Sequence, residues 1–96
     1  MKYTWQESKR QANLEKHRLD FIDADYVLES PYRFDIETIR KGEIRRQSFA
    51  YVFERLMVLT IVYISSNTPH IISFRPAKSS EREVYYDWLE NNYNDH

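Results

Sequence analysis

The sequence predicts an α+β fold, in which two N-terminal helices and one C-terminal helix lie on one face of a small antiparallel sheet of three or four strands. Two observations lead to this prediction. Both ends of the chain have helix-forming residues with apolar side chains at helical spacing, and the middle has strand-forming residues in alternation. With 96 residues, of which 42% are hydrophobic, the chain is expected to form a single domain over residues 1–96.

Residues 7–19 favour the first helix, because they are good helix formers without proline or glycine. The apolar stripe of this helix is thin, so the helix is expected to pack lightly and to expose most of its surface. The stripe consists of Ala12, Leu14 and Leu19. Asp20 can cap a second, shorter helix over residues 22–28, and Pro31 stops it.

The strands are expected in the middle of the chain. Residues 32–42 have no clear period and contain the only glycine, Gly42, so they are interpreted as a loop or a frayed edge strand. Residues 44–53 alternate between two faces, as a strand does. Residues 56–64 are β-branched and apolar on both faces, which is typical of a central strand, and residues 70–75 form the third clear strand.

The last helix is predicted from a capping box, Ser80-x-x-Glu83, and is expected to run to about Tyr93. Its apolar side chains recur at helical intervals. They are Val84, Tyr85, Trp88 and Leu89.

Several classes of protein are excluded by what the sequence lacks. Without cysteine there are no disulfides and no thiolate metal sites. No signal peptide is evident, and the longest apolar stretch is too short to span a bilayer, so a cytoplasmic protein without membrane contact is expected. The chain has neither a phosphate-binding glycine loop nor a nucleophile elbow, and no His, Asp or Glu group has metal-ligand spacing. No metal and no cofactor are therefore expected.

Charge is distributed in blocks along the chain, although the formal net charge is only −1. Residues 1–18 contain five basic and two acidic side chains, and residues 39–78 contain seven and two. A basic face made from these blocks would favour nucleic-acid binding. A mixed, solvated surface is the plainer alternative.

Two polar clusters lie within these basic blocks. Lys9, Asn13, Lys16 and His17 are separated by helical offsets, so they share one face of the first helix. The segment Ile71-Ile72-Ser73-x-Arg75-x-Ala77 is a strand that leaves the core at an arginine and leads into the last helix. Together the two clusters indicate a site that handles phosphate.

An ordered set of motifs along the chain resembles the BrnT family, the toxins of bacterial type II toxin–antitoxin systems. The motifs are Trp5-x-Glu7-x-Lys9-x-x-x-Asn13-x-x-Lys16-His17, Asp20-Phe21, Ala24, Gly42-Glu43-x-Arg45 and Ile71-Ile72-Ser73-x-Arg75-x-Ala77-x-x-x-Glu81-Arg82-x-x-Tyr85. The resemblance implies a RelE-like fold and an endoribonuclease that cleaves RNA and inhibits translation. It also implies neutralisation by a cognate BrnA-like antitoxin, through which alone the toxin would contact DNA.

The chain departs from the family pattern at a few positions. Arg18 stands where the family usually has glycine, so the turn there must differ or must tolerate arginine. Ala50 replaces a common glycine in the first long strand, and the second long strand is about two residues longer than usual. Lys78 replaces a small hydroxyl residue near the presumed site.

RNA cleavage without a metal needs a base, cations that stabilise the phosphorane and an acid for the leaving oxygen. The expected catalytic residues are His17, Arg45, Arg75 and Tyr85. The expected substrate-binding residues are Lys9, Lys16, Arg46, Lys78 and Tyr86. Arg45 and Arg46 point to opposite faces of their strand, so at most one of them belongs to the centre of the site, and the resemblance selects Arg45.

Each of the main candidates also has a structural interpretation. His17 can serve as a cation that complements the dipole at the helix end. Arg75 can form an ion pair with Glu81 or Glu83 that holds the last helix in place. Tyr85 can be a core tyrosine whose hydroxyl reaches a polar rim.

Two other functions remain open beside the ribonuclease. One is a non-catalytic module that binds RNA or the ribosome. The other is a protein-interaction domain with an aromatic interface, which would be favoured if Arg45 and Arg75 were buried in ion pairs. Its aromatic residues would be Tyr32, Phe34, Tyr51, Phe53 and Tyr93. For the antitoxin, the expected contact is the strand face shared by Arg45, Phe49, Tyr51 and Phe53.

Overall fold

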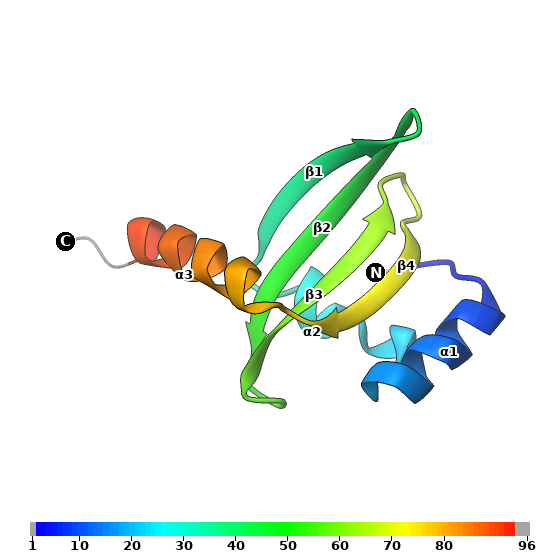
Figure 1. Cartoon of the computed structure of the whole chain (residues 1–96), viewed down its shortest axis with the longest axis horizontal. Helices are drawn as coiled ribbons and strands as arrows, with labels where there is room; N and C mark the ends of the chain where they lie inside the picture. Colours follow the sequence, from blue (N-terminus) through cyan, green and yellow to red (C-terminus); the bar gives the residue numbers. More distant parts are fainter. Residues whose placement is uncertain (1, 94–96) are drawn as a thin grey trace.

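A computed structural model describes residues 2–93 and confirms the α+β class (Figure 1). The side chain of Tyr93 lies outside the described part. In chain order the elements are α1 (Glu7–His17), a 3₁₀ turn (Phe21–Asp23), α2 (Asp25–Leu28), β1 (Phe34–Arg40), β2 (Glu43–Val52), β3 (Met57–Ile64), β4 (His70–Pro76) and α3 (Ser79–Tyr93). The four strands form one antiparallel meander in the order β1-β2-β3-β4. The RelE-like comparison agrees with this order and stays a prediction.

The segment interpreted as a loop or frayed strand is the edge strand β1. It is joined to β2 by the two-residue turn Lys41-Gly42, because Arg40 pairs with Glu43. Both turn residues have left-handed backbone angles, with φ of 52° and 77°. A tight hairpin turn of this kind requires positive φ at both positions, which explains why the only glycine lies here.

The helices cover both faces of the sheet, so the prediction that they share one face is wrong. The 3₁₀ turn and α2 bury their apolar side chains with Leu59, Ile61 and Phe74 on one face. On the other face Tyr85 of α3 packs with Phe49 and other apolar side chains. Figure 1 shows α3 leaving the sheet on the side away from α1. The physical reason is that β3 carries apolar side chains on both faces, and each face needs a cover.

The first helix is shorter than predicted, and of its predicted apolar stripe only Leu19, which follows the helix, is buried in the core. It ends at His17, and Arg18 takes the left-handed conformation (φ 59°) that usually favours glycine at a helix end. Ala12 is exposed and Leu14 only half-buried, whereas Asn13 is the buried residue of the helix. Asp20 acts as a cap, as predicted, but it caps the 3₁₀ turn, accepting the N–H of Ile22 at 3.2 Å.

The N-terminal region closes the outer edge of β4. The amide of Asn13 accepts the backbone N–H of Phe74 at 3.1 Å and donates to the carbonyls of Phe74 at 2.7 Å and Leu19 at 2.9 Å. Upstream of the helix, the Thr4 carbonyl accepts the N–H of Ile71 at 2.8 Å, and the Thr4 N–H donates to the Pro69 carbonyl at 2.9 Å. The unpaired backbone groups of an edge strand are thereby satisfied.

The last helix begins earlier than the predicted capping box. Ser79 is its first residue, and the carboxylate that reaches back to the helix start belongs to Glu81, which accepts the Lys78 N–H at 2.7 Å. The predicted pairing of Ser80 with Glu83 is therefore wrong by two residues. No helix among residues 2–93 combines the length and apolarity needed to cross a membrane.

Replacing Asn13 by alanine is expected to destabilise the fold by about 2–4 kcal/mol, because two buried carbonyls and a buried N–H lose their partner. The measurement is urea unfolding followed by circular dichroism. Gln11→Ala is the matched control, since Gln11 is exposed on the same helix and should lose well under 1 kcal/mol. Equal losses for the two variants would show that the amide of Asn13 does not hold the edge.

Candidate functional site

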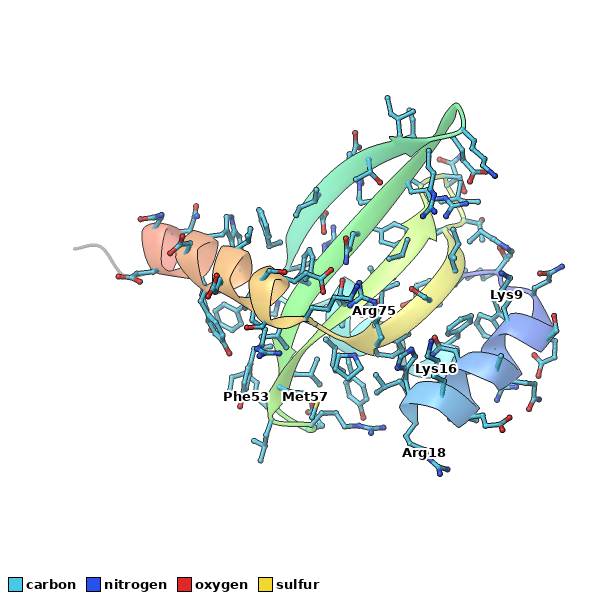
Figure 2. All side chains as sticks on the ribbon, in the orientation of Figure 1. Lys9, Lys16, Arg18, Phe53, Met57 and Arg75 are labelled. Carbon is cyan, nitrogen blue, oxygen red and sulfur yellow. The ribbon has the colours of Figure 1, made fainter. Side chains whose placement is uncertain are left out.

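Two lysines and one histidine of α1 flank the covered edge of β4. Lys9, Lys16 and His17 lie four residues before, three after and four after Asn13, so they share its face of the helix. Because Asn13 is bonded to Phe74, this face lies beside Arg75, the next residue of β4. Figure 2 shows Lys9 and Lys16 on α1, and Arg75 on β4 towards the start of α3.

The imidazole of His17 is half-buried at the end of α1. Burial lowers the pKa of His17 below its ordinary value, and the charges of Lys16 and Arg75 lower it further. The imidazole is therefore neutral at pH 7 and can accept a proton.

Arg75 forms the ion pair that the sequence offered as its structural interpretation, and the partner is Glu81. Its Nη1 and Nη2 lie 2.8 and 2.9 Å from the two carboxylate oxygens, and 21% of each side chain is exposed. Gln47 of β2 also donates to Glu81, at 3.1 Å. The donors lower the pKa of Glu81 to about 2, with the Arg75 hydrogen bonds as the largest cause.

The ion pair leaves part of the Arg75 guanidinium unused. A guanidinium has five N–H donors, and Glu81 with the Pro76 carbonyl (3.2 Å) takes three of them. The other two are the Nε–H and the second N–H of Nη2, which lie side by side on one edge. Within residues 2–93 neither has a hydrogen-bond acceptor, so this edge keeps the geometry that binds two phosphate oxygens.

The two β2 arginines lie apart from this cluster. Arg45 shares the sheet face of Gln47 and Arg75, but by the strand register it lies four residues, about 13 Å, further along the sheet, where it pairs with Glu43 at 3.1 Å. Arg46 is on the opposite face and pairs with Glu37. Both arginines are thus ion-paired in this structure.

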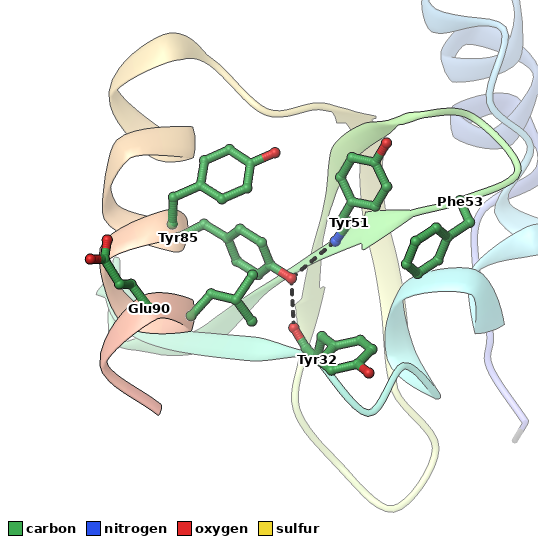
Figure 3. A pocket seen from close by; sticks show the side chains of 7 residues that line it. Tyr32, Tyr51, Phe53, Tyr85 and Glu90 are labelled. Atoms are coloured by element: carbon green, nitrogen blue, oxygen red, sulfur yellow. Dashed lines mark hydrogen bonds between the residues drawn. The ribbon is translucent and has the colours of Figure 1, made fainter. Parts of the chain in front are cut away.

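Tyr85 lies in the core, which agrees with its structural interpretation as a core tyrosine. It is fully buried, and its hydroxyl donates to the Tyr32 carbonyl at 2.8 Å and accepts the Tyr51 N–H at 3.1 Å (Figure 3). These bonds fasten α3 to the sheet and leave the hydroxyl out of contact with solvent. The neighbouring Tyr86 is 45% exposed and lies on the α3 surface.

The structure therefore brings together only part of the predicted set. Lys9, Lys16, His17 and Arg75 gather along the β4 edge, and exposed Lys78 follows where β4 leads into α3. The sequence did not identify the support of Arg75 by Gln47. Its only signal was that residue 47 shares a strand face with Arg45. Within residues 2–93 no three His, Asp or Glu side chains are grouped as metal ligands.

One comparison with known proteins gives a family. A family model described as the ribonuclease toxin BrnT of type II toxin–antitoxin systems matches residues 5–81. The match extends from Trp5, before α1, to Glu81, and includes the β4 edge and its cationic residues. No curated protein matches the chain.

The ion pair between Arg75 and Glu81 predicts how the free energy of unfolding changes at acidic pH. The pKa of Glu81 is about 2 in the folded protein and ordinarily 4.5, so its stabilisation is complete above pH 4.5 and is lost as the pH falls towards 2. Glu81→Gln should cost about 2 kcal/mol at pH 7 and flatten the stability profile between pH 4.5 and 2. Urea melts at several pH values measure this.

The control is Glu83→Gln, which changes an exposed carboxylate of the same helix and should leave the profile unchanged. A Glu81→Gln profile as steep as that of wild type would contradict the assignment.

Proposed function

Because this chain belongs to the BrnT family of ribonuclease toxins of type II toxin–antitoxin systems, we propose that it cleaves RNA in the cytoplasm, inhibits translation and is neutralised by a cognate, BrnA-like antitoxin. Residues 1–96 act in this proposal as one domain. The observation that carries it is the unused edge of the Arg75 guanidinium beside a neutral His17 and the lysines of α1.

The proposed reaction begins with the 2′-hydroxyl of RNA, which attacks the adjacent phosphate. His17 accepts the hydroxyl proton, because its lowered pKa keeps the imidazole neutral at pH 7. The free edge of Arg75 donates two hydrogen bonds to the phosphorane, whose charge is greater than that of the starting phosphate. The imidazolium of His17 can then return its proton to the departing 5′-oxygen. No step in this scheme requires a metal ion.

Substrate binding is assigned to the side chains around this centre. Lys9 and Lys16 follow the β4 edge and can neutralise phosphates on either side of the cleaved bond. Lys78 lies beyond Arg75, at the start of α3. Arg45 is too far along the sheet to join the chemistry and serves as a contact for a more distant phosphate of the same strand.

The competing function is a protein-interaction domain with an aromatic interface. The observation that favours it is that Arg45 and Arg75 are both ion-paired. We prefer the nuclease because the pair fixes Arg75 without using its second edge. Induced expression alone, compared with expression together with the antitoxin, tests the proposal in cells. Growth arrest that the antitoxin relieves, together with cleavage of RNA by the purified protein in EDTA, supports it.

Replacing Arg75 by alanine is expected to slow RNA cleavage by roughly a hundredfold or more, because the phosphorane loses its cation. Arg75→Lys keeps a charge without the paired donors and should recover little of the rate. Cleavage of a labelled oligonucleotide, at a temperature where all variants are folded, is the measurement.

The control for Arg75 is Glu81→Gln, which breaks the same ion pair and keeps the guanidinium. It loses the preorientation of Arg75 and keeps its charge and donors, so it should retain much more of the cleavage rate than Arg75→Ala. If it loses as much activity as Arg75→Ala, the pair matters for structure and Arg75 is not a catalytic residue.

For His17 the prediction concerns pH. The wild-type rate should rise with pH as His17 loses its proton, at a pKa below 6.5, and His17→Gln should lower the rate and abolish this rise. His70→Gln is the control, since His70 lies near the start of β4 and is bonded to the Thr4 hydroxyl at 2.8 Å. An unchanged pH profile in His17→Gln would assign proton transfer to another group.

A further inference from the structure

An aromatic groove separates α3 from the end of the β2–β3 hairpin. It has a volume of about 500 Å³. Its main lining residues are Tyr32, Tyr51, Phe53, Tyr86 and Leu89 (Figure 3). A second hollow continues from it along the hairpin and the β4–α3 connection, and shares Tyr51 and Tyr86 with it.

The apolar residues at the hairpin end stabilise little within the chain. Phe53 is 66% exposed, although its ring lies edge-on to that of Tyr51 at 5.1 Å. Leu56 is 75% exposed and has a left-handed backbone (φ 56°), which is unfavourable for a residue with a side chain. Figure 2 shows Phe53 with Met57 at this end of the molecule. Exposed apolar side chains grouped in this way mark a docking surface.

The charges around the groove select the kind of partner. Carboxylates line the groove and the hollows that adjoin it, and Arg82 is the basic lining residue among the residues described there. The carboxylates are Glu54, Glu83, Asp87 and Glu90. Such a rim repels the phosphates of RNA and also repels the same rim on a second copy of the chain. It favours a protein segment that carries lysine or arginine beside its apolar side chains.

We propose that this groove docks a segment of the antitoxin that places apolar side chains between α3 and the hairpin and basic side chains against the acidic rim. The proposal rests on the proposed function for the identity of the partner. The adjoining hollow is lined by Pro76, Ala77 and Arg82, so a bound segment ends next to the connection that carries Lys78. From there the antitoxin can reach over the Arg75 site.

This surface differs from the expected one. Phe49, predicted to contact the antitoxin beside Arg45, is only 2% exposed and lies under α3. Tyr51 of the same strand and Phe53, which follows the strand in the hairpin turn, line the groove instead. The aromatic contact with the antitoxin is therefore proposed at the hairpin end and not on the sheet face.

The test compares two variants that add the same charge at exposed apolar positions. Phe53→Asp changes the groove, and Ile39→Asp changes a residue of β1 that is 76% exposed and does not line it. Calorimetric titration with the purified antitoxin should show affinity at least thirtyfold weaker for Phe53→Asp and unchanged for Ile39→Asp. Both variants should cleave RNA at the wild-type rate, since neither touches the Arg75 site.

The outcomes distinguish a failure of the docking proposal from a failure of the proposed ribonuclease function. Unchanged antitoxin affinity in Phe53→Asp contradicts the proposal that the antitoxin docks in the groove. It does not contradict the proposed ribonuclease function. If Phe53→Asp weakens antitoxin binding but the wild-type protein does not cleave RNA, the docking groove is supported and the proposed ribonuclease function is contradicted. Weaker binding of labelled single-stranded RNA, or a wild-type dimer that Phe53→Asp dissociates, would identify a different occupant and overturn the proposal.

The charge of the partner has a separate test. Asp87→Lys and Glu90→Lys reverse two carboxylates of the rim, and both should weaken antitoxin binding several-fold, with the effect largest at low salt. Tighter binding in these variants would mean that the docked segment is acidic, and would overturn the proposal.

Discussion

The side-chain amide of Asn13 is the contact on which the rest of this structure depends. It replaces a fifth strand at the edge of β4, since it pairs with both backbone groups of Phe74, and it also ties the chain after α1 through Leu19. An apolar residue could fill this space but would leave the edge unsatisfied. The site follows from this contact, because fixing Asn13 on Phe74 sets His17 and the lysines of α1 beside Arg75.

Arg75 has two sets of N–H donors, which explains why the sequence allowed both a structural ion pair and a phosphate-binding role for it. Its end-on donors hold Glu81, and through Glu81 they fix the first turn of α3 and the orientation of Gln47. Its side-on donors have no hydrogen-bond acceptor within residues 2–93. An ion pair that orients a guanidinium in advance removes part of the entropic cost of binding a phosphate, so structural and chemical roles here support each other.

Sequence reasoning predicted the elements whose patterns are local. The alternation of β2 and the apolar run of β3 identified two strands to within a residue of their bounds, and the resemblance to the BrnT family was confirmed. It could not predict the sides on which the helices pack, because that depends on which face of the sheet each connection reaches. It also misjudged α1, where a buried asparagine does the work expected of an apolar stripe. The proximity of His17 and Arg75 was suspected from chemistry, and only tertiary structure could supply it.

The long separation between Asn13 and Phe74, 61 residues, has a consequence for synthesis. The helix that carries His17 is synthesised before the strand edge that receives it. A nascent chain therefore has no assembled cationic cluster until β4 has emerged, since non-local contacts form only when both partners are available. The helix and the strand edge that together form this cluster are therefore brought together only by the completed tertiary fold.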